Sequence, residues 1–322
     1  MTPRRAVAVA AAVLGVAAAL SVAIWATTAG TRAAPSPGTD FLVPSDSSAA
    51  RAAESAAAGS PEAEAAAHLA GRPTAVWLTP ETSPVDEVGA RVTDLVDQAR
   101  AEGRALALVV YGLPGRDCGG LSAGGLAEAD YRDWVGAIGE ALEGGVTTVV
   151  VLEPDSLALA PECGNVAERQ AQLSDALAAL TSESIFVYLD GGHSRWLPPA
   201  EMADLIAGVE GRERARGFAT NVSNSNDDAL EIAYAHEVAE RLGPGAHAVI
   251  DTSRNGSDST GEWCNASGRS IGAPAGAYGD DIVDTNLWIK PPGESDGPCN
   301  GGAPAGEWMP RAAVELTRDV LR

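Results

Sequence analysis

Seven short runs rich in aliphatic and β-branched residues recur along this chain at intervals of roughly 30–40 residues. Stretches with helical spacing of apolar residues separate them, for example Val88, Val92, Leu95 and Ala99, which stop at Gly103. This alternation predicts βα units around a parallel sheet. Because the runs are almost continuously apolar, we expect both sheet faces to be covered, as in an α/β barrel or a doubly wound sheet. The runs are 75–79, 105–111, 146–153, 185–190, 217–220, 247–251 and 286–290.

The first 61 residues carry different signals. Arg4 and Arg5 precede a run, Ala6 to Gly30, that contains no charged residue. A basic start and an apolar run indicate export across a membrane, so residues 1–32 are expected to be a signal peptide. Because the run exceeds the usual core of roughly 7–15 residues, an uncleaved signal anchor is the alternative. Residues 33–61, rich in Ala, Ser and Pro, are expected to be a linker without regular structure, and residues 62–322 one folded domain.

Composition excludes several classes of partner. The chain has 22 Lys plus Arg against 44 Asp plus Glu, a formal net charge of −22. Such a field repels phosphate backbones and anionic lipid, so we expect no nucleic acid, and no membrane contact except through an uncleaved N-terminal anchor. Four Cys and four His are too few and too scattered for a zinc cluster. No metal and no other cofactor is therefore expected.

Polar side chains follow the predicted strands. Acidic residues come after five of the seven runs, at the strand ends where α/β enzymes place their chemistry. One such Asp is usually a helix cap, but five together indicate a site. Tryptophans near the same ends are candidate platforms for sugar rings, whereas core packing is favoured for Trp134 and equally plausible for Trp288. The residues are Asp117, Asp155, Asp190, Asp251 and Asp296, with Trp77, Trp196, Trp263 and Trp288.

The four cysteines agree with this arrangement. Cys118 and Cys163 follow the second and third runs, and Cys264 and Cys299 follow the sixth and seventh. Of the three connectivities, only Cys118–Cys163 with Cys264–Cys299 joins loops of neighbouring strands on one face. These disulfides would close loops of roughly 45 and 35 residues, each stabilising by about 4 kcal/mol in the chain-entropy model.

Clustered carboxylates, aromatic platforms and an exported acidic chain indicate hydrolysis of glycosidic bonds. In that reaction one carboxylic acid protonates the leaving oxygen, while water or a second carboxylate attacks. The acid needs a raised pKa, which burial or a neighbouring anion supplies. Asp117 near Asp155 could provide that negative charge.

Seven motifs, in order, make the assignment specific. Together they closely resemble glycoside hydrolase family 6, the family of endoglucanases and cellobiohydrolases, over roughly residues 74–322. The motifs are Val109–Cys118, Glu153–Leu157 in the sequence EPDSL, Tyr188–His193, Ala219–Asn224, Asp251–Gly256, Trp263–Asn265 and Lys290–Gly297.

The resemblance implies a distorted seven-stranded parallel β/α barrel, with residues 62–322 as the catalytic domain, that hydrolyses β-1,4-glucan with inversion. It makes Asp155 the general acid, Asp117 the residue that raises the pKa of the acid and organises the attacking water, and Asp296 the disputed base. Tyr111 matches the tyrosine that crowds the distorted sugar. The implied substrate-binding residues are Trp77, Asp190, His193, Trp196, Asn221, Trp263, Lys290 and Glu294.

The loops decide between modes of action. Those after Cys118 and Asp296 are short, which favours an open cleft and endo action, with an exo-acting cellobiohydrolase as the alternative. Less favoured are a non-catalytic glucan-binding relative and a serine esterase, suggested by the Gly-x-Ser-x-Gly pattern around Ser122. We expect a secreted monomer, or a surface-anchored one, whose partner is a β-1,4-glucan such as cellulose.

Overall fold

The computed structural model describes residues 33–321. The predicted signal peptide or anchor, residues 1–32, lies outside the described residues. The compact unit that contains the predicted motifs begins at Ala34. Among the residues described, no helix is both long and apolar enough to cross a membrane.

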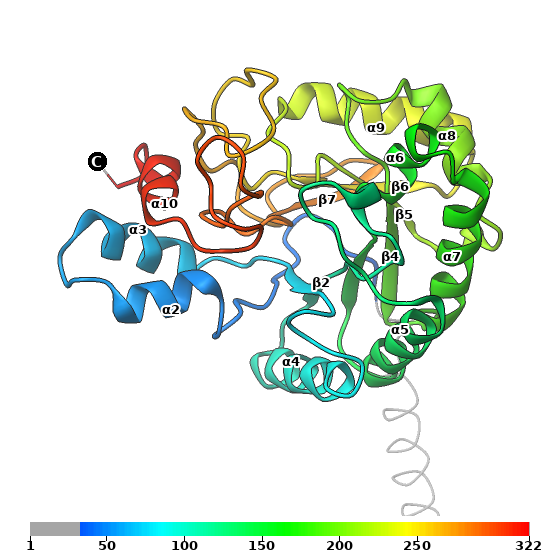
Figure 1. Ribbon diagram of the computed structural model, residues 1–322, viewed down its shortest axis with the longest axis horizontal. Coiled ribbons are helices and arrows are strands. Elements are labelled where there is room, and N and C mark those ends of the chain that lie inside the picture. The colour runs from blue at the N-terminus through cyan, green and yellow to red at the C-terminus, as the bar shows by residue number, and fades with distance from the viewer. Residues whose placement is uncertain (1–32, 322) are drawn as a thin grey trace, which may run out of the picture. The chain divides into compact units, whose positions relative to one another are not determined.

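Seven parallel strands form one curled sheet whose spatial order is their order in the chain, β1 to β7 (Figure 1). Each strand pairs with the next in register, for example Leu106 with Thr148 and Val110 with Leu152. This confirms the predicted distorted α/β barrel. The strands are β1 (Val76–Leu78), β2 (Leu106–Val110), β3 (Thr148–Leu152), β4 (Ile185–Asp190), β5 (Gly217–Thr220), β6 (His247–Asp251) and β7 (Val283–Leu287).

The last strand begins earlier than predicted. The sequence pattern favoured 286–290, whereas β7 spans Val283–Leu287. Beyond Leu287 the ladder ends because the buried Asp251 carboxylate accepts the next N–H groups, those of Ile289 at 3.2 Å and Lys290 at 3.0 Å. A side chain therefore replaces a strand partner at this point.

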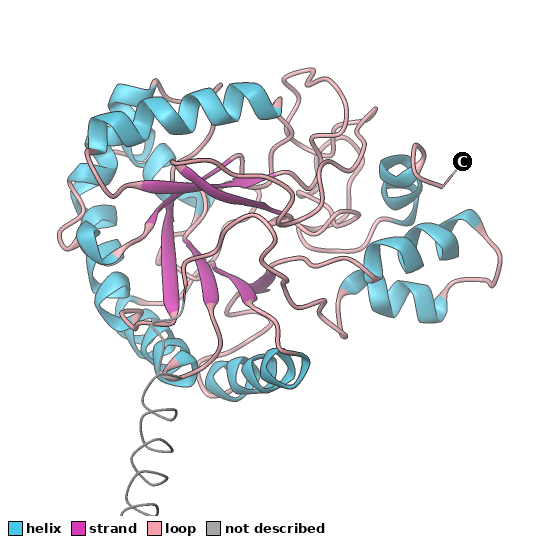
Figure 2. Ribbon diagram, turned by 180° about the vertical axis from the view of Figure 1, so that it is seen from behind, coloured by secondary structure: helices cyan, strands magenta, loops and turns pink. Residues whose placement is uncertain are grey.

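Helices line the outside of the sheet in a continuous arc, from α4 round to α9, and α2, α3 and α10 gather on the other side (Figures 1 and 2). The predicted helix that starts at Val88 ends where Gly103 adopts φ 67°, as expected of a glycine C-cap. The helices are α2 (Ser48–Ser55), α3 (Pro61–Ala70), α4 (Val88–Glu102), α5 (Glu128–Leu142), α6 (Ser156–Cys163), α7 (Val166–Ala179), α8 (Pro199–Ala207), α9 (Asp228–Leu242) and α10 (Pro310–Thr317).

The core has two layers. Alternate strand residues such as Leu108 and Val150 pack outward against the helices, including Trp134 of α5. Their neighbours Val109 and Val151 point into the barrel, where they pack with Tyr111 and other inward residues. Burial on both faces explains why the strands are almost wholly apolar.

The segment 33–61, predicted as an unstructured linker, is folded. Phe41 pairs with Ala105 in a parallel bridge, and its side chain, 2% exposed, lies in the barrel interior. It fits there because β1 is short and pairs with β2 only from Leu108 onward, which leaves the start of β2 open. Sequence reasoning missed this because one aromatic residue among Ala, Ser and Pro shows no periodicity.

The rest of the segment forms a helical layer with the C-terminal helix. The Ser47 side chain caps α2 by accepting the Ala50 N–H. Ala49 of α2 and Leu69 of α3 pack around Trp288, which is 2% exposed and donates its indole N–H to Ala273 O at 2.8 Å. Trp288 and Trp134 are therefore core residues.

Candidate active site

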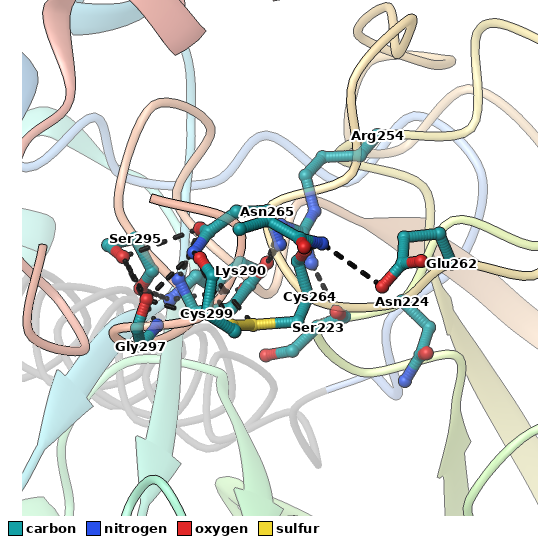
Figure 3. A network of polar contacts seen from close by, with 12 residues as sticks. Ser223, Asn224, Arg254, Glu262, Cys264, Asn265, Lys290, Ser295, Gly297 and Cys299 are labelled. Atoms are coloured by element: carbon teal, nitrogen blue, oxygen red, sulfur yellow. Dashed lines mark hydrogen bonds and ion pairs between the residues drawn. A yellow bond between two sulfur atoms is a disulfide. The ribbon is translucent and has the colours of Figure 1, made fainter. Parts of the chain in front are cut away.

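The predicted site residues come together at the carboxyl ends of the strands. Both predicted disulfides are confirmed, Cys118–Cys163 and Cys264–Cys299, each with Cα atoms 6.2 Å apart. Cys118–Cys163 ties the loop after β2 to the end of α6, and the second disulfide ties together the loops after β6 and β7 (Figure 3).

Asp155 occupies a turn of unusual backbone geometry between β3 and α6. Glu153 and Asp155 have φ angles of 51° and 67°, in the left-handed region that non-glycine residues rarely adopt. Strained residues of this kind cluster at functional sites. The main-chain N–H of Asp155 donates to Asp190 Oδ2 at 2.9 Å, so the turn is held against the end of β4.

Burial and neighbouring negative charges raise the pKa of the Asp155 carboxyl. Desolvation raises its pKa well above the usual value, and the negative charges of Asp190, Asp117 and Asp296 raise it further, in that order. The sequence had pointed to Asp117 as the source of this charge. The structure adds Asp190, whose negative charge raises the pKa of Asp155 more than any other neighbouring charge does.

Asp190 is 1% exposed, and burial raises its pKa to about 7 even though the N–H groups of Asp155 and Gly192 donate to it. Asp117 lies in a short 3₁₀ turn at φ 57°, where its carboxylate accepts the Ser122 N–H at 2.6 Å. The loop after β2 is therefore folded around the Asp117 side chain.

Tyr111 lies against Trp77 and is close enough to Asp155 and Asp117 to be influenced by their charges. Its ring meets Trp77 edge-on, with centroids 5.4 Å apart, and the Arg116 guanidinium lies 4.5 Å from its centroid. Burial, followed by the charges of Asp155 and Asp117, raises the pKa of Tyr111, so its phenol stays neutral.

Asp296 has the opposite electrostatic environment. Its Oδ2 accepts from Arg254 Nη1 at 2.7 Å and from the Asn265 N–H at 2.9 Å, and Lys290 Nζ lies 3.8 Å from Oδ1. Burial alone would raise the pKa of Asp296, but Arg254 and Lys290 together hold it below the usual value. The pKa values of Asp296 and Asp155 are therefore shifted in opposite directions.

Lys290 and Glu294 follow β7. Lys290 is buried and donates to Ser295 O at 2.9 Å, and its ammonium lies 5.8 Å from the Trp77 ring centroid. Glu294 accepts a 2.6 Å hydrogen bond from the Ser48 hydroxyl, at the start of α2. The segment predicted as linker thus reaches a predicted substrate-binding residue.

The remaining aromatic residues differ in exposure. Trp263 is 51% exposed, which fits a stacking platform, whereas Trp196 is half-buried beside His193, with ring centroids 5.5 Å apart. Burial lowers the pKa of His193 to about 4, so its ring is neutral above that pH. The ring Nδ1 of His193 accepts the Arg195 N–H at 3.2 Å.

Asn221 is fully buried, and its side chain binds the loops after β5 and β6. Its Nδ2 donates to Asp251 O and to Asn255 Oδ1, and its Oδ1 accepts the Asn226 N–H. With both ends of the amide engaged, Asn221 holds the loops after β5 and β6 together and belongs to the network around the site.

Two further residues of the candidate site, Glu153 and Asn265, had no assigned role at the sequence level. Glu153 is 1% exposed, accepts the N–H groups of Gly112 and Leu113, and has a pKa that burial raises to about 7. Asn265 contacts Asp296 through both backbone and side chain. Both residues lie in motifs that the sequence shows. Their hydrogen-bond partners are some 30 to 40 residues away along the chain, so the sequence alone could not pair them.

Ser122 does not occupy a nucleophile elbow. Strand β2 ends at Val110 and α5 begins at Glu128, so Ser122 lies inside a loop and not between a strand and a helix. Within residues 33–321, no group of three or more His, Cys, Asp or Glu side chains could hold a metal ion.

A parallel α/β barrel in which the pKa of one carboxyl is raised and that of another is lowered, beside tryptophan rings, defines a class: the acid–base hydrolases of barrel fold. More specifically, this chain belongs to the family described as glycosyl hydrolases family 6, whose model matches residues 37–320.

Sequence relatives and solved structures agree with this family assignment. Endoglucanase A of Cellulomonas fimi is 41% identical over 77% of this chain, and this match spans only 54% of the relative. Endoglucanase 1 of Streptomyces halstedii is 38% identical over 86% of this chain and 88% of the relative. The endoglucanase Cel6 from Mycobacterium tuberculosis, solved with methyl-cellobiosyl-4-deoxy-4-thio-β-D-cellobioside, superposes with a TM-score of 0.82 at 38% identity, covering 90% of this chain and 100% of that one. Cellobiohydrolase II from Humicola insolens gives 0.76 at 26% identity, covering 90% and 98%.

Proposed function

We propose that this protein is an inverting β-1,4-glucanase that cleaves internal bonds of cellulose or related glucans, with Asp155 as the general acid. The observation that carries the proposal is the contrast between two carboxyls. Burial and three neighbouring acidic groups keep Asp155 protonated, whereas Arg254 and Lys290 keep Asp296 ionised. Pairs of titratable groups whose pKa values are driven apart identify acid and base assignments.

The proposed reaction follows from these charges. Asp155 donates its proton to the glycosidic oxygen as that bond breaks, and a water molecule forms the new bond to the anomeric carbon from the opposite face. Asp117 raises the pKa of the acid and organises this water. The proton that the water releases passes, directly or through further water, toward the ionised Asp296. Tyr111 packs against the distorted sugar at the cleavage point.

Substrate binding is assigned to the residues that surround this centre. Trp77, Trp196 and Trp263 offer ring faces to glucosyl units, and His193, Lys290 and Glu294 offer polar contacts, with Asn221 holding the loops. The support is that solved relatives carry cello-oligosaccharides: a cellobioside derivative in the M. tuberculosis endoglucanase, and glucose with cellotetraose in the H. insolens cellobiohydrolase.

Endo action is the favoured mode because several of the most similar relatives are named endoglucanases. An exo-acting cellobiohydrolase is the second candidate, since relatives such as cellobiohydrolase C of Emericella nidulans are 34% identical. One contact favours it: Leu121, in the loop after β2, lies against Gly297 in the loop after β7, where an added Cβ would be 3.3 Å from Leu121 Cβ. Leu121 is 45% exposed, which marks this as a point contact and not a packed roof.

We also propose that the protein is secreted and monomeric, with surface anchoring through residues 1–32 as the alternative. Two disulfides support a compartment outside the reducing cytosol. The reaction as proposed proceeds with side chains and water alone.

Product analysis tests the proposal. On carboxymethyl cellulose, viscosity should fall quickly relative to reducing ends released, and NMR of early products from cellotetraose should show the inverted α-anomer. Asp155→Asn, which keeps size but cannot donate a proton, should lose about 10²–10⁴-fold in turnover while still binding cellotetraose. Slow viscosity loss with cellobiose as the main early product would show exo action. Near wild-type turnover of the variant would refute the assignment of the acid, and hydrolysis of p-nitrophenyl acetate alone would indicate an esterase.

A further inference from the structure

Asn265 and Asp296 bind each other reciprocally. The Asn265 main-chain N–H donates to Asp296 Oδ2 at 2.9 Å, and the Asp296 main-chain N–H donates to Asn265 Oδ1 at 2.9 Å. The two residues belong to different loops, after β6 and after β7, and Figure 3 shows Asn265 reaching from one loop into the other. One residue, Asn265, therefore contacts both the carboxylate and the backbone of Asp296.

The other end of the Asn265 side chain holds the same loop. Its Nδ2 donates to Gly297 O at 2.7 Å and to Cys299 O at 2.9 Å. The loop is built closely around this amide, because a Cβ on Gly302 would lie 2.0 Å from Asn265 Nδ2. Asn265 also adopts φ 47°, a conformation that Asn tolerates better than most residues.

Arg254 shares the Asp296 carboxylate with Asn265, because its Nη1 donates to the same oxygen, Oδ2, at 2.7 Å. Arg254 and Lys290 set the charge of this carboxylate, but Lys290 Nζ is 3.8 Å away and donates instead to Ser295 O. Asn265 lies on the same short stretch as the Cys264–Cys299 disulfide, which limits how far it can move relative to the loop after β7. Asn265 thus contacts both the carboxylate and the main chain of Asp296, whereas Arg254 contacts the carboxylate.

We propose that Asn265 is a positioning residue for the reaction: it holds the Asp296 carboxylate in the orientation that receives the proton released by the attacking water. This inference rests on the proposed function, because it gives Asp296 that role. Asn265 itself acts through Asp296 and does not touch the reacting atoms.

A purely structural role predicts something different, and Asn300 separates the two. Asn300 also has a left-handed backbone, at φ 48°, and lies in the same disulfide-linked region. Its Nδ2 donates to Cys264 O at 2.8 Å and to Glu262 Oε1 at 3.1 Å, so it joins the same two loops without contacting Asp296. Asn300→Gly is therefore a matched control for Asn265→Gly, since glycine preserves either backbone conformation.

The test is a double-mutant cycle on the full chain with cellotetraose as substrate. Asn265→Gly should lower kcat at least tenfold with KM within a factor of two, whereas Asn300→Gly should stay within twofold of wild type. In the Asp296→Asn background, Asn265→Gly should change kcat less than twofold, because its target has been removed. An equal loss in both backgrounds would overturn the proposal. If Asp296→Asn alone leaves kcat unchanged, the proposed role of Asp296 fails instead.

A second variant covers the case in which Asn265→Gly does not fold. Asn265→Asp keeps the Oδ1 acceptor but replaces the donor with a carboxylate beside Asp296, in a site that also contains Arg254, Lys290 and Asp155. A new negative charge raises the pKa of Asp296, so the acidic limb of the kcat profile should move to higher pH. An acidic limb that matches wild type, with equal thermal stability, would contradict the proposal.

Discussion

The main-chain N–H of Asp155 donates a 2.9 Å hydrogen bond to Oδ2 of Asp190, while Oδ1 of Asp190 is buried without a hydrogen-bond partner among the described residues. Both side chains have pKa values raised by burial, and the charge of Asp190 is the largest electrostatic influence on Asp155. Two interacting buried carboxyls titrate as a pair, and repulsion prevents both from ionising near neutral pH. Asp190, at the end of β4, therefore raises the pKa of Asp155, which follows β3.

Asp190 should control the pH range of activity more strongly than Asp117. Removing a negative neighbour lowers the pKa of Asp155, and because the general acid must be protonated, the basic limb of the kcat/KM profile moves to lower pH. We expect Asp190→Asn to move this limb further than Asp117→Asn. Asp175→Asn, on the exposed face of α7, makes the same charge change far from the site and should leave the limb in place. A larger shift from Asp117→Asn than from Asp190→Asn would reverse the assignment.

Phe41 should be as important to stability as any strand residue. It is 2% exposed inside the barrel, so Phe41→Ala should lower the free energy of unfolding by about 3–5 kcal/mol. The control is Leu230→Ala on α9, where the side chain is 46% exposed and the expected change is within about 0.5 kcal/mol. Urea unfolding measures both, and similar small losses would mean that Phe41 is not part of the core.

Sequence patterns predicted the features that depend on local residue spacing, namely the strands and the disulfides. Hydrophobic runs located seven strands, with three bounded exactly as 185–190, 217–220 and 247–251, and strand order predicted the disulfides. Patterns failed where a distant side chain decides the outcome. The end of β7 depends on Asp251, and the order in residues 34–61 depends on a place for Phe41 beside β2.

The site shows the same division. Motifs predicted Asp155, Asp117 and Asp296 as site residues, and the structure places all three after strands whose carboxyl ends converge. The dominant influence of Asp190 and the reciprocal binding of Asn265 required coordinates, since both depend on contacts between loops that are remote in sequence. Likewise, only the structure shows that the amide of Asn221 is wholly engaged by its neighbours.

Ser48 should tune substrate binding from outside the predicted domain. Its hydroxyl donates at 2.6 Å to Glu294, whose pKa burial raises and this bond lowers. Ser48→Ala removes a hydrogen bond to a carboxylate, for which we expect a KM increase of roughly 3–10-fold with kcat little changed. Ser55→Ala, at the far end of α2, removes an exposed hydroxyl that bonds only within the helix and should leave KM unchanged. Equal KM values for the two variants would show that α2 does not act on Glu294.

Glu153 should make the protein less stable as pH rises from about 4.5 to about 7. Its side chain is 1% exposed, and burial raises its pKa from the usual value of 4.5 to about 7. Between these two values the folded chain holds a proton that the unfolded chain has released. The stabilisation is therefore complete below about pH 4.5 and is lost as pH rises to about 7, a difference of up to ~3 kcal/mol.

Glu153→Gln isolates this contribution, because an amide oxygen in the place of Oε2 still accepts the Gly112 and Leu113 N–H groups, each at 3.2 Å, and the amide does not titrate. The stability of the variant should fall less between pH 5 and pH 8 than that of wild type, as measured by urea unfolding at both values. Glu183→Gln, an exposed substitution of the same kind, should follow the wild-type dependence. If Glu153→Gln and wild type lose the same free energy of unfolding over this range, Glu153 is ionised throughout, and its buried charge must be neutralised by the nearby Arg116.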